Sequence, residues 1–160
     1  MVIKTSFNNI NFSKDINLPN NNEKYINEIK DKISNLESLN IVNDSNLLNE
    51  TIDTTIKFSK NKNDFLIFGT GGSNLGAKAL INIKQGDIKK NMFFYDNIDP
   101  INFKNSIEKI DLFNAGIIII SKSGSTPETL SQFGSLIEIF DQNSSLDILY
   151  KNSLIITEDK

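Results

Sequence analysis

The sequence predicts an α/β fold, a parallel sheet flanked by helices, preceded by a helical N-terminal segment. Beyond about residue 60, short apolar runs alternate with stretches of helical periodicity, which is the pattern of consecutive βαβ units. Those runs are continuous rather than alternating, as in strands that are covered on both faces. Before residue 60, apolar residues recur at helical spacing only.

Residues 1–60 are the predicted helical segment. Helical spacing predicts one helix over about 22–39 and a second over about 44–58. We interpret the two apolar stripes as surfaces that face the core, and we expect the segment to pack on the domain that follows. The stripes consist of Tyr25, Ile26, Ile29, Ile33 and Leu36 in the first helix and Leu48, Ile52, Thr55 and Ile56 in the second.

Residues 61–160 are the predicted α/β domain. Its strands are the apolar runs Phe65–Phe68, Met92–Tyr95, Gly116–Ile120 and Leu154–Ile156. Helices are predicted between them over about 75–83, 99–110 and 126–140, with Asp99 as the cap of the second and Pro100 in its first turn. Because such a sheet commonly continues past a fourth strand, we expect the domain to be truncated at its C-terminal end.

Two turns follow strands and open helices, and both are rich in small polar residues. Gly71-Gly72-Ser73-Asn74-Leu75-Gly76 follows the first strand, and Ser121-Lys122-Ser123-Gly124-Ser125-Thr126 follows the third. The start of a helix presents free backbone N–H groups and the positive end of the helix dipole. Hydroxyls beside such amides form a site for a phosphate group. In one parallel sheet, both turns open on the same edge and could share one ligand.

Each turn also has a purely structural interpretation. Ser73 could simply cap its helix, and Thr126 with Pro127, or Ser125 with Glu128 as a capping box, could cap the other. Capping leaves Ser121 and Ser123 unexplained. Nucleotide motifs fit poorly, because the glycine turn lacks the third glycine of G-x-G-x-x-G and the correctly placed lysine of a P-loop.

The composition excludes several classes of protein. A net charge of −3 and a pI near 5.0 indicate no nucleic-acid partner, since polyanion binders carry a basic surface. No apolar run is long enough to cross a membrane, and no signal peptide is visible. The chain has no cysteine, which excludes disulfides and thiolate sites and favours a reducing, cytoplasmic location.

The chain also has no histidine, and all 17 of its basic residues are lysines. A Ser-His-Asp triad and histidine-ligated metals are therefore excluded. No arginine is present to clamp a phosphate with two parallel hydrogen bonds. Each hydrogen bond to a charged group contributes roughly 1.5–3 kcal/mol, so several hydroxyls and amides could hold a phosphate without arginine.

At the two turns, the chain resembles the glucose-6-phosphate isomerase (phosphoglucose isomerase) family. Residues 68–76, Phe-Gly-Thr-Gly-Gly-Ser-Asn-Leu-Gly, resemble its GIGGS-x-L-G turn. Residues 121–129, Ser-Lys-Ser-Gly-Ser-Thr-Pro-Glu-Thr, resemble its S-K-[TS]-x-[TS]-T-x-E-T turn. Asn97-Ile98-Asp99-Pro100 resembles the segment between them, and the order of the turns also agrees. The likeness runs from about Phe65 to Thr157.

The resemblance implies a sugar isomerase domain, a flavodoxin-like, nucleotide-binding-type sandwich that often occurs in homodimers. It implies a hexose 6-phosphate ligand and a reaction through an enediol, with no metal or organic cofactor. The family's catalytic glutamate, histidine, arginine and lysine lie later in its chains, so no catalytic residue is expected here. The implied substrate-binding residues are Gly72, Ser73, Ser121, Lys122, Ser123, Gly124, Ser125 and Thr126.

Three functions are consistent with these features. The resemblance favours an N-terminal portion of a glucose-6-phosphate isomerase, which supplies the phosphate-binding turns. A stand-alone module that senses sugar phosphates, without a catalytic half, is the alternative. The failed nucleotide motifs make a nucleotide-binding enzyme the weakest of the three.

Overall fold

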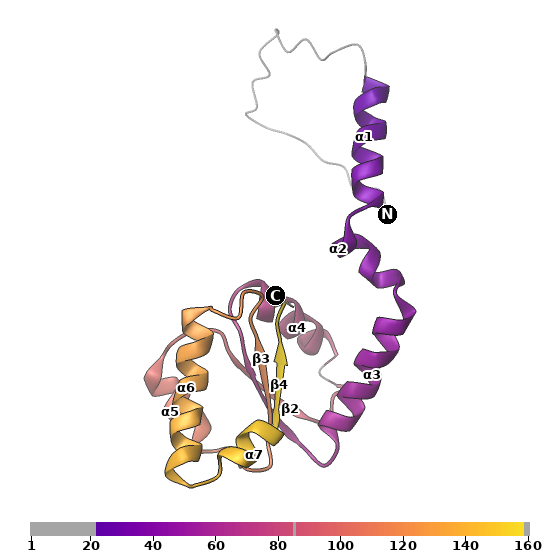
Figure 1. Ribbon diagram of the computed structural model, residues 1–160. Helices are drawn as coiled ribbons and strands as arrows, with labels where there is room; N and C mark the ends of the chain where they lie inside the picture. The colour runs from indigo at the N-terminus through magenta and orange to yellow at the C-terminus, as the bar shows by residue number, and fades with distance from the viewer. Residues whose placement is uncertain (1–21, 85, 159–160) are drawn as a thin grey trace. The chain divides into compact units, whose positions relative to one another are not determined.

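The computed structural model describes residues 22–84 and 86–158 of the chain (Figure 1). Contacts divide the chain into two compact units, Met1–Asn49 and Glu50–Lys160, and each is described by itself. The start of the predicted helical segment lies outside the described residues. The predicted boundary at residue 60 stays a prediction, since a division by contacts does not by itself define a folding domain.

The predicted single helix over 22–39 is wrong, because the chain forms shorter consecutive helices. They are α1 (Asn22–Ser34), α2 (Glu37–Asn40) and the 3-10 turn η1 (Ile41–Asn43), followed by α3 (Ser45–Ser59). The side chains of Ser34 and Asn35 both donate to the Asp31 carbonyl, at 2.9 and 2.8 Å. Short polar side chains that bond the last carbonyls of a helix compete with its continuation.

The apolar stripes of α1 and α3 are exposed, and the prediction that they face a core stays a prediction, because the two units are each described by themselves. Ile29 of α1 is 56% exposed and Ile56 of α3 is 62% exposed. Within residues 23–49 every described side chain is exposed, so these helices do not bury each other's apolar sides. Only the C-terminal end of α3 makes a ring contact, where Phe58 packs on Phe65 with ring centroids 6.1 Å apart.

Four parallel strands form one sheet in the order β2-β1-β3-β4. They are β1 (Asp64–Phe68), β2 (Asn91–Tyr95), β3 (Gly116–Ile120) and β4 (Ser153–Ile156), so all four predicted strands are confirmed. At its carboxyl end, Phe68 of β1 pairs with Tyr95 on one side, while Ile119 of β3 follows in register on the other. From β1 the chain runs to β2 at one edge of the sheet, and then crosses to β3 on the other side of β1.

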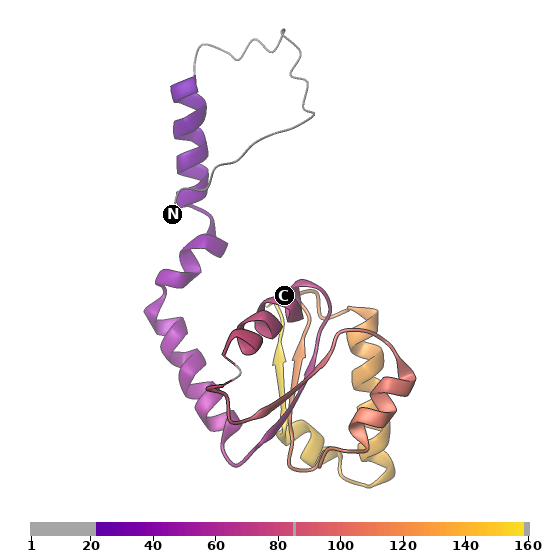
Figure 2. The ribbon, with the colours of Figure 1, turned by 180° about the vertical axis from the view of Figure 1, so that it is seen from behind.

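Helices cover both faces of the sheet, as the α/β prediction requires. The first crossover contains α4 (Gly72–Ile83), the second α5 (Pro100–Ile107), and the third α6 (Pro127–Gln142) and α7 (Leu146–Lys151). Figures 1 and 2 show α4 on one face, with α5 and α6 together on the other. The six-residue helix α7 was not predicted, because it is too short to show helical periodicity.

The core fills the space between the sheet and the layer of α5 and α6. The Phe68 and Tyr95 rings stack there with centroids 4.8 Å apart. This packing holds the carboxyl ends of the strands, where the two polar turns begin, on a rigid support. The fully buried members of the core are Leu66, Phe68, Ala115, Ile117, Leu136, Phe140 and Leu149.

Candidate functional site

The two polar turns lie next to each other at the carboxyl edge of the sheet. They follow β1 and β3, which are neighbours, and the chain diverges to opposite sides after these strands. A Cβ placed on Gly69 would lie only 3.1 Å from the Ile120 carbonyl oxygen, so the first turn touches the residue that precedes the second. Ligands of open α/β sheets bind in the crevice at such a switch point.

In the glycine turn, α4 begins after Gly71 without a capping side chain, and Ser73 does not cap it. Gly71 occupies the N-cap of α4 with φ +52°, a conformation that favours glycine, and no side chain caps the helix. Ser73 is the second residue of α4 and is partly exposed, so the alternative in which it serves as the cap is wrong. The turn thus presents a helix terminus without a side-chain cap, beside a serine hydroxyl.

In the serine turn, the hydroxyls bond to one another instead of capping α6. The Ser121 and Thr126 hydroxyls are 2.9 Å apart, and Ser125 donates to the Ser123 hydroxyl through both its backbone N–H and its side chain. Thr126 is the N-cap residue of α6, yet its side chain makes no capping hydrogen bond. Thr126 and Pro127 thus take the predicted N-cap and first-turn positions, the Ser125–Glu128 capping box does not form, and α6 also begins without a side-chain cap.

The segment after β4 holds the middle of the serine turn. The Lys122 carbonyl accepts hydrogen bonds from the Glu158 backbone N–H at 3.2 Å and the Thr157 hydroxyl at 3.4 Å. The Lys122 ammonium lies 3.3 Å from the Glu158 carboxylate. Both side chains are more than half exposed, so this ion pair contributes little stability, and Lys122 can leave it to bind an anion. Gly124 has φ +67°, which allows the reversal of the chain.

Three buried polar side chains behind the turns escaped the sequence analysis. Asn74 and Thr129, in the first turns of α4 and α6, are 0% exposed, and Gln132 of α6 is 5% exposed. Each has one oxygen without a hydrogen-bond partner: Asn74 Oδ1, Thr129 Oγ1 and Gln132 Oε1. The Asn74 amide donates to the Gly69 carbonyl, and the Gln132 amide donates to the Asn97 carbonyl in the loop after β2. A single sequence shows polar residues at these positions but not their burial.

The acidic residues after β2 have structural roles, and that of Asp99 is the predicted one. Asp99 caps α5 by accepting hydrogen bonds from the backbone N–H groups of Ile101 and Asn102, at 3.0 and 3.1 Å. Asp96 pairs with Lys78 of α4 at 2.9 Å. These carboxylates are therefore occupied in turns and ion pairs beside the candidate site.

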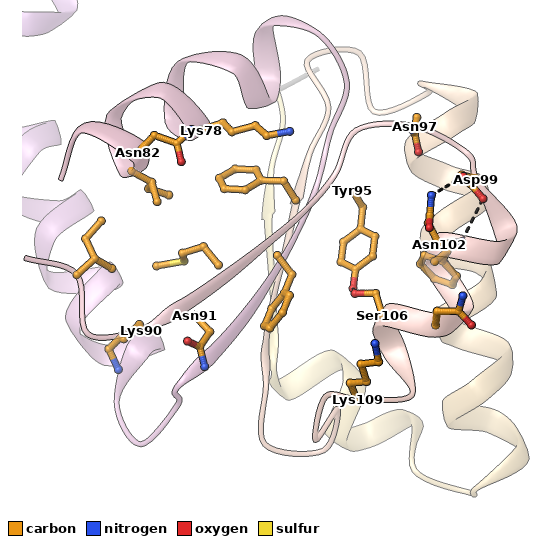
Figure 3. A pocket seen from close by; sticks show the side chains of 17 residues that line it. Lys78, Asn82, Lys90, Asn91, Tyr95, Asn97, Asp99, Asn102, Ser106 and Lys109 are labelled. Atoms are coloured by element: carbon orange, nitrogen blue, oxygen red, sulfur yellow. Dashed lines mark hydrogen bonds between the residues drawn. The ribbon is translucent and has the colours of Figure 1, made fainter. Parts of the chain in front are cut away.

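A separate open hollow of about 960 Å³ runs along β2, at the edge of the sheet (Figure 3). None of the predicted site residues lines it. Several of its polar groups are engaged: Lys90 donates to two backbone carbonyls, and the Tyr95 and Ser106 hydroxyls are 2.8 Å apart. Burial raises the pKa of Tyr95, so its phenol is not a base at neutral pH. The hollow therefore contains neither the helix N-termini nor the hydroxyl cluster of the two turns.

In residues 22–84 and 86–158, no helix is long and apolar enough to cross a membrane. In the same ranges, no three His, Cys, Asp or Glu side chains lie close enough together to hold a metal ion. The two adjacent helix termini remain the strongest candidate site in the described part of the chain.

Comparison with known proteins agrees with this geometry. The family description "Phosphoglucose isomerase" matches residues 23–156, which is most of the chain and includes both turns.

The chain belongs to the phosphoglucose isomerase family.

Individual relatives of this family support the assignment. The chain is 35% identical over 121 residues to a probable glucose-6-phosphate isomerase of Methanococcus maripaludis, covering 71% of this chain and 27% of the relative. It is 36% identical over 91 residues to a probable glucose-6-phosphate isomerase of Haloquadratum walsbyi, covering 54% of this chain and 21% of the relative. The chain thus spans only about a fifth to a quarter of the length of these relatives.

Solved structures share the fold. A glucose-6-phosphate isomerase from Chlamydia trachomatis superposes with a TM-score of 0.61 at 26% identity, over 67% of this chain and 21% of that protein. A hypothetical protein from Thermus thermophilus superposes with a TM-score of 0.73 at 22% identity, over 86% of this chain and 34% of that protein, and shows the fold alone. The prediction of a sugar-isomerase-type α/β fold is confirmed.

Proposed function

We propose that this chain is the N-terminal portion of a glucose-6-phosphate isomerase and supplies the turns that bind the substrate phosphate. The whole enzyme interconverts glucose 6-phosphate and fructose 6-phosphate, and it works in the cytoplasm as a homodimer. The observation that carries the proposal is the pair of α4 and α6 N-termini, both without side-chain caps, at one switch point in a chain of this family.

The chemistry of the turns suits a phosphate monoester. The positive ends of the α4 and α6 dipoles favour a dianion, although the Ser73 and Asn74 amides already donate to the Thr70 and Gly71 carbonyls. The hydroxyls of Ser73, Ser123 and Thr126 are short donors that reach an oxygen without much loss of side-chain entropy. Lys122 adds a positive charge once it leaves Glu158. Donors of this kind replace the arginine that the chain lacks.

Binding can be measured on the chain itself. Glucose 6-phosphate, titrated into labelled protein, should shift the backbone amide resonances at the starts of both α4 and α6 with one common dissociation constant. A common constant means that the two turns share one anion. Shifts at one helix only, or two different constants, would show that they do not. Glucose without phosphate should shift neither set.

We expect the double substitution Ser123→Ala and Thr126→Ala to weaken glucose 6-phosphate binding about tenfold. Ser123 is exposed and Thr126 is partly exposed, so the fold should be kept, and the remaining backbone amides should retain part of the affinity. The matched control is Thr55→Ala with Ser135→Ala, which removes two exposed hydroxyls that bond only helix carbonyls. Equal affinity in both double variants would mean that the hydroxyls of the serine turn do not bind the phosphate.

A further inference from the structure

We propose that Asn74 is a positioning residue for this anion site, an inference that rests on the proposed function. Asn74 lies in the first turn of α4 and is 0% exposed, so it cannot touch the ligand directly. Its side-chain amide donates a hydrogen bond to the Gly69 carbonyl. The bond ties the end of β1 to the helix that the glycine turn opens.

The position of Gly69 shows what this bond controls. A Cβ on Gly69 would lie 3.1 Å from the Ile120 carbonyl oxygen on one side and 3.2 Å from the Asn74 oxygen on another. The glycine is therefore clamped between the end of β3 and the Asn74 side chain. Because Ser121 directly follows Ile120, the clamp fixes the distance between the two turns, and with it the spacing of the α4 and α6 amides.

The orientation of the Asn74 amide is set by its surroundings. With the amide turned round, two carbonyl oxygens would face each other at Gly69, and this repulsion excludes the reverse orientation. The observed orientation leaves Oδ1 buried without a partner. An apolar residue at position 74 would remove this unpaired acceptor but would leave the Gly69 carbonyl unpaired, so the two effects on stability oppose each other. The role of the asparagine is better explained by its hydrogen bond to the Gly69 carbonyl.

A second buried asparagine, Asn152, can distinguish a positioning effect on binding from a general effect on stability. Asn152 is 9% exposed, and its side-chain amide donates to the Phe113 carbonyl at 2.9 Å. It directly precedes β4, at the amino end of the sheet and away from both turns. Asn74 and Asn152 thus make the same kind of hydrogen bond at opposite ends of one sheet.

The test compares Asn74→Leu with Asn152→Leu in the same glucose 6-phosphate titration. We expect Asn74→Leu to bind three- to tenfold more weakly while its midpoint of thermal unfolding stays near that of the unsubstituted chain. In its spectra, the α6 amides should still respond to ligand, whereas the response of the α4 amides should shrink. Asn152→Leu should show the reverse, a lower unfolding midpoint and unchanged affinity. If Asn74→Leu does not fold, Asn74→Ala provides the same comparison.

Three outcomes would overturn the proposal. Unchanged affinity and unchanged α4 shifts in Asn74→Leu would show that the clamp does not position the site. Equal losses of affinity in the Asn74 and Asn152 variants would show that Asn74 acts only through overall stability. If the unsubstituted chain itself shows no phosphate-dependent shift, the proposed anion site fails, and the positioning role fails with it; only this outcome also contradicts the proposed function.

Discussion

Replacing Gly69 with valine is expected to reduce glucose 6-phosphate binding at least about a hundredfold. Gly69 is buried, and a single Cβ there would already meet Ile120, Ser73 and Asn74 within 3.1–3.2 Å. The two further methyl groups of valine cannot fit without moving the glycine turn away from the end of β3. Separating the turns would remove at least two hydrogen bonds to a charged phosphate, each worth roughly 1.5–3 kcal/mol. Overpacking should also lower the free energy of unfolding by about 1–3 kcal/mol.

The control for this substitution is Gly134→Val, in the middle of α6 and outside both turns. A Cβ on Gly134 would meet nothing within 4 Å, and valine is no worse than glycine inside a helix. Its affinity and unfolding midpoint should therefore stay close to those of the unsubstituted chain. Calorimetric titration with glucose 6-phosphate and thermal unfolding measure both quantities. Near-normal affinity in Gly69→Val would show that the contact between the turns is not needed for binding.

The strands were predictable because strong, local features define them. A run such as Phe65–Phe68 or Gly116–Ile120 is too short and too apolar for an exposed helix, and the alternation with helical stretches determines that the sheet is parallel. The start of α5 was predictable for a similar reason, since Asp99 caps it through its own side chain. Such features depend on neighbours within a few residues.

The parts that were missed depend on contacts at a distance or on competition within a helix. The helical spacing of Tyr25 to Leu36 says nothing about what would cover the stripe, and in the described unit its members are exposed. The break after Ser34 comes from side chains that bond the Asp31 carbonyl, an alternative that periodicity cannot show. The Gln132 amide bonds the Asn97 carbonyl, which only the folded chain brings beside it, and the burial of Asn74 likewise depends on packing that a single sequence does not show.

The site itself was predicted as two neighbouring turns, and its internal bonding was not. The sequence left open whether the hydroxyls cap their helices, because a hydroxyl at a helix start is compatible with both roles. In the folded chain, the Ser121 and Thr126 hydroxyls bond each other, and the Ser125 hydroxyl donates to that of Ser123. No side chain forms a capping hydrogen bond at the start of α6. These hydroxyl pairs are preformed donors that can turn toward an anion. The assignment of Gly72, Ser73 and residues 121–126 as substrate-binding residues stays a prediction.

The second large effect is an absence of turnover, which we expect from residues 1–160 alone. Isomerisation needs a base that moves a proton between C1 and C2, and opening of the ring needs an acid–base group near the ring oxygen. The chain has no histidine for either role. Two carboxylates lie beside the serine turn: Glu128 in the first turn of α6, and Glu158, which pairs with Lys122. In a hexose 6-phosphate, C1 and C2 lie at the opposite end of the sugar from the phosphate, so groups beside a bound phosphate do not reach them.

Binding of the phosphate cannot by itself replace these groups. An interaction that is equally strong in the substrate and in the transition state leaves the chemical barrier unchanged. Because enzymes typically accelerate reactions by about a millionfold or more, the chain should fall short of a complete relative by at least that factor. A coupled assay for fructose 6-phosphate decides the matter, with the full-length Methanococcus maripaludis relative as the positive control. Turnover that disappears with Ser123→Ala would show that this chain holds catalytic groups. Turnover that survives the substitution would point to a contaminating isomerase, since it would not depend on the serine turn.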